Sequence, residues 1–176
     1  GYGSGKSVFM ADLIIDRLMN SSYFRCFYGR KVFDTIRDSI FKTITDRIEE
    51  RGLSYEFIYS TADNSSMRIK HRYSGNIMIP FGADKAHKLK SIKDTSHIIC
   101  EELDQFTLDD FGVLLSRLRK KGINTQLIGA FNTTTVKPDH WIKEVLFSDK
   151  GEEILGESIT ITKLFCNYSD NYFMNH

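Results

Sequence analysis

Apolar residues recur at helical spacing in four segments of the chain. From Ser7 to Asn20 they return every three or four residues, which predicts a helix with one broad buried face. Four isoleucines repeat at every fourth position between Asp34 and Gly52, so we expect a second long helix with Asp34 as its N-cap and Gly52 as its C-cap. Two further amphipathic helices are predicted at Thr107–Lys121 and Pro138–Phe147.

Shorter runs of apolar and β-branched residues between these helices predict strands. Three compact apolar runs predict buried strands, and a fourth run, in which apolar and polar residues alternate, predicts the last strand. These four runs are Phe24–Tyr28, His97–Cys100, Gln126–Phe131 and Ser158–Phe165. Three more short runs, separated by turn residues, predict a meander or hairpin at Tyr55–Ser60, Met67–Arg72 and Asn76–Pro80. The pattern predicts one α/β domain with a mostly parallel central sheet flanked by helices, plus a small antiparallel insertion.

The composition fits a single globular domain. The chain has 176 residues, of which 24 are Lys or Arg and 23 are Asp or Glu, so its formal net charge is +1. Any contact with nucleic acid must therefore come from local patches. Cys26, Cys100 and Cys166 have no CxxC partner, which favours buried thiols over a zinc site or a disulfide frame. No apolar run approaches the roughly 20 residues of a membrane span, and the chain does not open like a signal peptide, so we expect neither a membrane protein nor a secreted one.

The chain opens with the residue types of a phosphate-binding loop. Its first seven residues read Gly-Tyr-Gly-Ser-Gly-Lys-Ser and lie directly before the first predicted helix. Glycines let the backbone curl around an anion, the helix N-terminus adds positive potential, the lysine reaches the phosphates, and the serine hydroxyl binds Mg²⁺. The first glycine of the full pattern falls one position before the chain begins, and an ordinary glycine-rich turn is the alternative. The nucleotide contacts that we expect are Gly1, Gly3, Ser4, Gly5, Lys6 and Ser7.

Polar side chains follow two of the predicted strands. Glu101 and Glu102 end the run His97–Cys100, and paired carboxylates at a strand end are suited to hold Mg²⁺ and to polarise a water molecule. We expect Glu101 to bind the metal and Glu102 to be the catalytic carboxylate; two solvated acids are the alternative. Asn132 follows the run Gln126–Phe131, where its amide could sense the γ-phosphate, although the Asn-Thr-Thr-Thr sequence is also typical of a plain turn.

Basic residues are candidates for two further roles. Phosphoryl transfer gains much from an arginine finger that neutralises charge in the transition state. The candidates are Arg30, Arg37, Arg117 and Arg119. The last two are expected on the helix after the acidic pair, where they could face a neighbouring subunit. The basic clusters at residues 85–93 and 117–121 could touch a DNA backbone, and for all of these residues a solvated or ion-paired surface position is the alternative.

The order of these motifs resembles the phage terminase large subunit over almost the whole chain. The phosphate-loop motif is common to many ATPases, but a Lys-Leu-Lys-Ser run before the acidic strand and a closing Tyr-x-Asp-Asn run are more specific. The matching runs are residues 1–7, 28–31, 36–41, 88–91, 98–102, 129–133 and 167–173. The resemblance implies a P-loop NTPase fold of the ASCE or RecA-like type. It also implies that residues 1–176 are the N-terminal ATPase domain, starting inside the Walker A loop, without the preceding strand and without the C-terminal nuclease domain.

Members of that family are ATP-driven motors that pack viral DNA. The resemblance therefore implies hydrolysis of ATP, with Mg²⁺, to translocate double-stranded DNA into a procapsid. Carried over by position, Lys6 and Ser7 would bind phosphates and Mg²⁺, Glu101 would hold the metal and Glu102 would be the catalytic carboxylate. Asn132 would lie in the block that couples hydrolysis to motion.

Three positions depart from the family pattern. Tyr2 stands where many members have Arg, Glu101 replaces the commoner Asp, and Thr133 stands where Pro is frequent. The absence of an arginine at position 2 is the reason to look for an arginine finger elsewhere in the chain.

The resemblance also implies partners and a location. These are double-stranded DNA, a portal protein, a terminase small subunit and further copies of the chain in a ring, in the cytoplasm of an infected bacterial host. Two alternatives stay open: another P-loop ATPase such as a helicase-like translocase, and a non-hydrolysing module that docks on a portal or small subunit. Nuclease activity is not expected from these residues.

Overall fold

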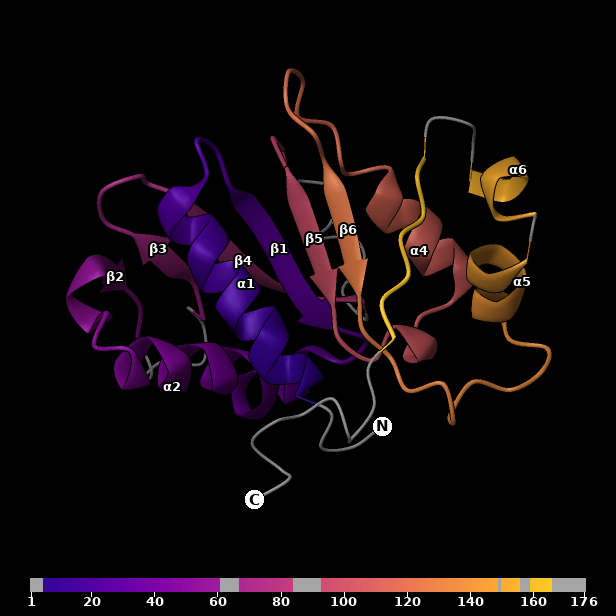
Figure 1. The fold of residues 1–176 in the computed structure, drawn as a ribbon, viewed down its shortest axis with the longest axis horizontal. Helices are drawn as coiled ribbons and strands as arrows, with labels where there is room; N and C mark the ends of the chain where they lie inside the picture. The colour runs from indigo at the N-terminus through magenta and orange to yellow at the C-terminus, as the bar shows by residue number, and fades with distance from the viewer. Residues whose placement is uncertain (1–4, 61–66, 84–92, 149, 156–158, 166–176) are drawn as a thin grey trace.

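A six-stranded sheet forms the centre of the structure, a computed structural model that describes residues 5–60, 67–83, 93–148, 150–155 and 159–165. The strand order is β2-β3-β4-β1-β5-β6 (Figure 1). The parallel strands are β4 (Ile77–Gly82), β1 (Arg25–Arg30), β5 (His97–Cys100) and β6 (Gln126–Gly129). β3 (Ile69–His71) pairs antiparallel with β4, and β2 (Phe57–Ile58) pairs antiparallel with β3. The predicted mostly parallel sheet with an antiparallel insertion is confirmed.

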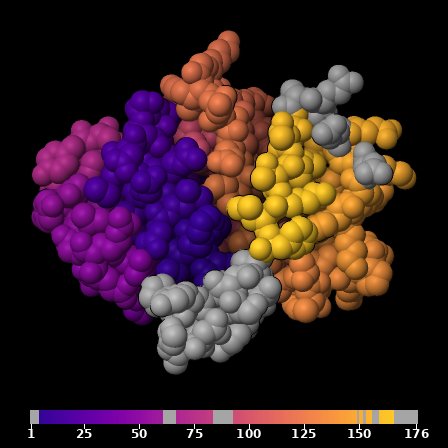
Figure 2. All heavy atoms as spheres, viewed as in Figure 1, coloured from indigo at the N-terminus to yellow at the C-terminus, as the bar shows by residue number. Residues whose placement is uncertain are grey.

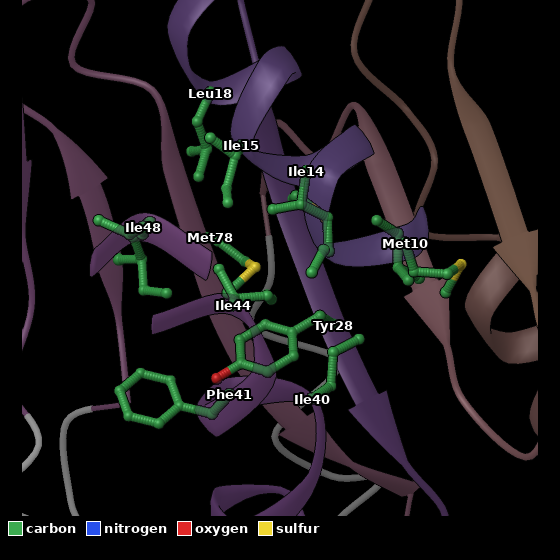
Figure 3. Packing of buried hydrophobic residues seen from close by; sticks show 14 of the residues in the cluster. Met10, Ile14, Ile15, Leu18, Tyr28, Ile40, Phe41, Ile44, Ile48 and Met78 are labelled. Carbon is green, nitrogen blue, oxygen red and sulfur yellow. The ribbon is translucent and has the colours of Figure 1, made fainter. Parts of the chain in front are cut away.

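Two helices pack on one face of this sheet. They are α1 (Lys6–Asn20), which crosses in front of β1 in Figure 1, and α2 (Lys42–Glu50). Tyr28 of β1 is fully buried beneath them and donates from its hydroxyl to the carbonyl of Met67 at 2.9 Å. Figure 3 shows the packing of the side chains around Tyr28, which come from α1, α2 and β4: Met10, Ile14, Ile15, Leu18, Ile44, Ile48 and Met78. Burial of each large apolar side chain contributes about 1.5–3 kcal/mol, and this layer fixes α1 against the sheet.

A second apolar cluster lies against α4 (Leu108–Leu115), α5 (Trp141–Phe147) and α6 (Gly151–Leu155). Trp141, the first residue of α5, anchors this packing. Its indole Nε1 donates to the carbonyl of Phe106 at 2.6 Å, and its ring lies 4.9 Å from that of Phe111. The sheet is therefore buried between two apolar layers, as expected for parallel strands.

The expected helix between Asp34 and Gly52 is broken into three pieces. A short 3-10 turn at Phe33–Thr35 has Val32, not Asp34, as its N-cap, and a π-helical segment at Arg37–Phe41 leads into α2. Ser39 has non-helical dihedral angles (φ −118°, ψ −109°), and its hydroxyl donates to the carbonyl of Thr35 at 2.8 Å. Such a side-chain bond competes with regular helix geometry. The C-cap of α2 is Arg51, not Gly52; Gly52 follows it with a left-handed φ of 68°, the conformation common just after a helix C-cap.

Two other predicted elements are wrong in extent or type. The helix expected over Thr107–Lys121 ends at Leu115, because Leu118 forms a parallel bridge with Thr95 beside β5 and the chain must turn to reach it. The last strand, expected over Ser158–Phe165, is absent from the described residues 159–165, which carry no strand. That segment is held by side chains instead, with the Phe165 ring 5.9 Å from that of Phe147.

The described cysteines and helices match the compositional expectations. Cys26 and Cys100 are buried free thiols, whereas Cys166 lies outside the described residues. None of the helices in the described ranges is long and apolar enough to cross a membrane.

Candidate active site at the carboxyl edge of the sheet

The first turn of α1 lies at the carboxyl ends of β5 and β6. Gly5 is its N-cap, in the left-handed region at φ 76°, and no side chain caps the turn. Glycine adopts this conformation without the steric penalty of a Cβ, and an uncapped helix N-terminus presents backbone N–H groups to an anion. The four residues before Gly5 lie outside the described residues, so the predicted contacts of Gly1, Gly3 and Ser4 stay predictions.

Lys6 joins the phosphate-loop helix to the tip of β6. Its Nζ donates to Oδ1 of Asn132 at 3.2 Å. Asn132 is placed by the end of the sheet, where the amide of Ala130 donates to the carbonyl of Cys100 at 2.9 Å. The structure therefore brings together two candidate residues that are far apart in sequence, and the role of Asn132 as a γ-phosphate sensor stays a prediction.

Glu101 lies directly after β5 and meets the hydroxyl of Ser7. The residue is 9% exposed, and the Ser7 side chain is hydrogen-bonded to its carboxylate. Burial is the largest cause that raises the pKa of Glu101; the Ser7 bond and Arg30 oppose the rise, and Glu102 adds to it. A buried carboxylate of this kind gains from a cation placed beside it.

Ser7 and Glu101 are the pair that would hold Mg²⁺. Among the described residues no group of three or more His, Cys, Asp or Glu side chains could enclose a metal ion. Mg²⁺ does not need such a cage, because it is usually bound by one or two carboxylates together with substrate phosphates and water. A serine hydroxyl bonded to a carboxylate beside a phosphate loop fits this requirement.

Glu102 is held by two side chains in an unusual backbone conformation. Its φ of 51° and ψ of 50° are left-handed, although it is not a glycine. One carboxylate oxygen pairs with Nη2 of Arg30, and the other accepts from Nε2 of Gln105 at 2.8 Å. The Arg30 Nε atom also lies 3.9 Å from Glu101. The carboxylates of Glu101 and Glu102 are thus both close to the guanidinium of Arg30.

Arg30 is carried to this position by the end of β1. The preceding residue, Gly29, lies so close to β4 that an added Cβ would be 2.0 Å from the carbonyl oxygen of Phe81. The next residue, Lys31, donates from Nζ to Asp110 at 2.5 Å, which links the end of β1 to the first turn of α4. Arg30, one of the candidate arginine fingers, therefore contacts the two acids of its own chain.

The other candidate arginines lie elsewhere. Arg117 and Arg119 are not on a helix, since α4 ends at Leu115, and they flank Leu118 beside Thr95, near the amino end of β5. That is the edge of the sheet opposite Glu101. Arg37 lies in the π-helical segment, where its Nε and Nη2 atoms are buried without a hydrogen-bond partner among the described residues.

Gln105 is the residue that the sequence analysis missed. It lies three positions after Glu102, in a short 3-10 turn, and donates to the Glu102 carboxylate. Side chains three residues apart in a helical turn lie on the same side. That spacing is the only signal in the sequence, and it depends on knowing that the chain turns immediately after the strand.

The fold and this edge define a P-loop NTPase. The parallel strands carry paired acids after β5 and an amide after β6 to the same edge as the first turn of α1, where the amide of Asn132 accepts from Lys6. A family model of the phage terminase large subunit matches residues 1–176, and the chain belongs to this family.

Individual relatives agree with this assignment. The PBSX phage terminase large subunit of Bacillus subtilis (strain 168) is 30% identical over 175 residues, which is 98% of this chain and 39% of the relative. A large terminase from a thermophilic bacteriophage, solved in complex with ATP-gamma-S, has a TM-score of 0.74 at 16% identity, over 98% of this chain and 39% of that one. The large terminase ATPase domain of Thermus phage P74-26 has a TM-score of 0.58 at 14% identity, and the match covers 83% of this chain and 61% of that one. The chain thus spans about two fifths of the first two relatives.

Proposed function

We propose that this chain hydrolyses ATP and that hydrolysis drives double-stranded DNA into a viral procapsid. The observation that carries the proposal is the meeting of Lys6, Ser7, Glu101, Glu102 and Asn132 at one edge of the sheet. These residues come from α1 and from the ends of β5 and β6. Family membership and the nucleotide in a structural relative support the same conclusion.

Each of these side chains has a defined task in the proposal. The first-turn amides of α1 and Lys6 bind the phosphates, together with Gly1, Gly3, Ser4 and Gly5 of the loop. Ser7 and Glu101 would hold Mg²⁺, which when bound neutralises charge on the phosphates. Glu102 orients the attacking water and accepts its proton, and Asn132 positions Lys6.

Each oxygen of Glu102 already has one side-chain partner: one is paired with Arg30 and the other accepts from Gln105. Each oxygen keeps a further lone pair that can accept a proton from water, so we infer that Arg30 and Gln105 orient the carboxylate for catalysis. An arginine finger from a neighbouring copy, with Arg117 and Arg119 as candidates, would act on the site from outside.

The wider setting follows from the family. We propose that copies of the chain act as a ring with a portal protein and a terminase small subunit, in the cytoplasm of the infected bacterial host. Residues 1–176 would be the ATPase domain, completed by a strand before Gly1 and followed by a separate nuclease domain.

The test replaces Glu102 by Gln. Glu102→Gln keeps the size of the side chain but removes its basicity, so ATP binding measured by calorimetry should stay within about twofold of the parent. Phosphate release should fall at least about 100-fold, the lower end of what a general base contributes. The matched control is Glu153→Gln, an exposed carboxylate on α6, which should leave both quantities unchanged.

Three results would contradict parts of this proposal. Turnover by Glu102→Gln at the parent rate would remove Glu102 from catalysis. A parent chain that binds no Mg-ATP would favour the non-hydrolysing docking module. DNA-stimulated hydrolysis accompanied by strand separation would favour a helicase-like translocase.

A further inference from the structure

The antiparallel insertion carries three exposed cations on and beside β3: Lys70 lies in the strand, Arg68 precedes it and Arg72 follows it in a turn. Arg68, Lys70 and Arg72 are all exposed, whereas the alternate residues Ile69 and His71 are buried. This alternation of buried and exposed residues indicates that the three cations point away from the core. We call these three residues the β3 cationic face.

None of the three cations is neutralised within the described part of the chain. Arg68, Lys70 and Arg72 form no ion pair and no side-chain hydrogen bond there. The exposed cation Lys42, by contrast, is paired with Asp46 at 2.7 Å. The nearest carboxylate in the register, Glu56, instead pairs with the buried His71, on the other face of the strand.

The packing of the sheet leaves this face open. Lys70 lies in register with Ile58 of β2 and Ile77 of β4, and Ile58 is 48% exposed. Figure 1 places β2 and β3 at the end of the sheet away from α4, α5 and α6, the helices of the second apolar layer. In Figure 2 the same segment forms one outer margin of the molecule. The β3 cationic face therefore points to solvent rather than to the core of the described residues.

We propose that the β3 cationic face binds the phosphate backbone of double-stranded DNA; this proposal rests on the proposed function of DNA translocation. The chain as a whole carries a formal charge of only +1, so a polyanion must be held by local sites of this kind. Ile58, in register with Lys70, and the rings of Tyr55 and Tyr73 are the exposed large apolar side chains around this face, so its charged part is formed by the three cations, and phosphate is the ligand complementary to them. Contacts to phosphate carry no base specificity, which suits a surface along which DNA must move.

The test measures the salt dependence of duplex binding by fluorescence anisotropy, with the full chain. Each phosphate contact contributes about 0.9 to the slope of log affinity against log salt. The triple variant Arg68→Gln, Lys70→Gln, Arg72→Gln should reduce the magnitude of that slope by about 2 to 3, equally for duplexes of different base composition. Its thermal unfolding midpoint and its ATP hydrolysis without DNA should match the parent, because all three side chains are exposed.

The control removes the same charge from the opposite end of the sheet. Lys137, Lys143 and Lys150 are also exposed, near α5 and α6, and their triple replacement by Gln should leave the slope unchanged. Equal slopes for the parent and the β3 variant would overturn the proposal, and so would an equal reduction in the control, since only net charge would then matter. Loss of ATP hydrolysis in the parent would contradict the proposed function alone, because the comparison of slopes does not depend on turnover.

Discussion

The burial of His97, at the start of β5, leads us to expect that acid destabilises the fold. The residue is 6% exposed, its Nδ1 lies 2.9 Å from Oγ of Ser96, and its ring lies 4.7 Å from that of Phe24. Burial, with a smaller contribution from Arg17, lowers the pKa of His97 from 6.5 to about 4. The folded state therefore favours the neutral ring, whereas the unfolded chain accepts a proton near the ordinary pKa.

The sign and size of the effect follow from that difference. The stability contributed by the neutral ring is fully present above pH 6.5 and is lost as the pH falls toward 4. Each pKa unit corresponds to about 1.4 kcal/mol, so the free energy of unfolding should drop by about 1.4 kcal/mol at about pH 5.5 and by about 2.5 kcal/mol at about pH 4.5. Below pH 4 the loss from His97 levels off, at a limit of about 3.4 kcal/mol.

Urea unfolding of the parent and of His97→Phe across this pH range isolates the effect. The variant keeps an aromatic ring against Phe24 but cannot titrate, while carboxylates such as Glu101 titrate in both proteins. The difference between the two curves should therefore change by the amounts given above. Curves that stay parallel from pH 7 to pH 4.5, or an NMR titration of the His97 ring with a midpoint near 6.5, would refute the reasoning.

Two further changes test the packing and the site. Gly29→Ala places a methyl group 2.0 Å from the carbonyl oxygen of Phe81 and should lower the free energy of unfolding by at least about 2 kcal/mol, within the usual range for overpacking. Gly112→Ala, on α4 with open space around it, should instead stabilise the fold by about 0.5–1 kcal/mol, and the opposite order in urea unfolding would contradict the strand geometry. Asn132→Ala removes the 3.2 Å contact to the phosphate-loop lysine and should lower kcat/KM for ATP by about 10- to 100-fold, the equivalent of a charged hydrogen bond of about 1.5–3 kcal/mol. The exposed neighbour Thr133→Ala should leave it unchanged, and equal losses in both variants would point to a general effect on the turn.

The elements best predicted from sequence are those whose burial pattern is local. The strand predicted at His97–Cys100 has the same bounds in the structure, and the first helix differs by one residue at its start. In both, the hydrophobic spacing reports directly on the face that packs against neighbours. The antiparallel insertion was predictable for a related reason, because turn residues separate its runs.

The misplaced elements depend on contacts that no local pattern contains. The helix after the acidic pair is amphipathic beyond Leu115, yet Leu118 is used in a bridge to Thr95 instead of a further turn. Ser39 bends the second helix through a hydroxyl bond to its own backbone, although the isoleucine spacing runs straight through it. Periodicity identifies which residues are buried, and tertiary pairing decides which conformation buries them.

Glu102 shows where sequence reasoning about the active site stops. Adjacent residues of a strand point to opposite faces, so two neighbouring acids should diverge. The left-handed conformation of Glu102 breaks that alternation, at a cost of about 1–2 kcal/mol for a residue with a Cβ. The ion pair with Arg30 and the bond from Gln105 offset this cost and fix where the carboxylate lies. Because each oxygen keeps a second lone pair, the interactions that stabilise the strained backbone also fix the direction from which Glu102 can accept a proton, which couples the conformation of this turn to the proposed turnover.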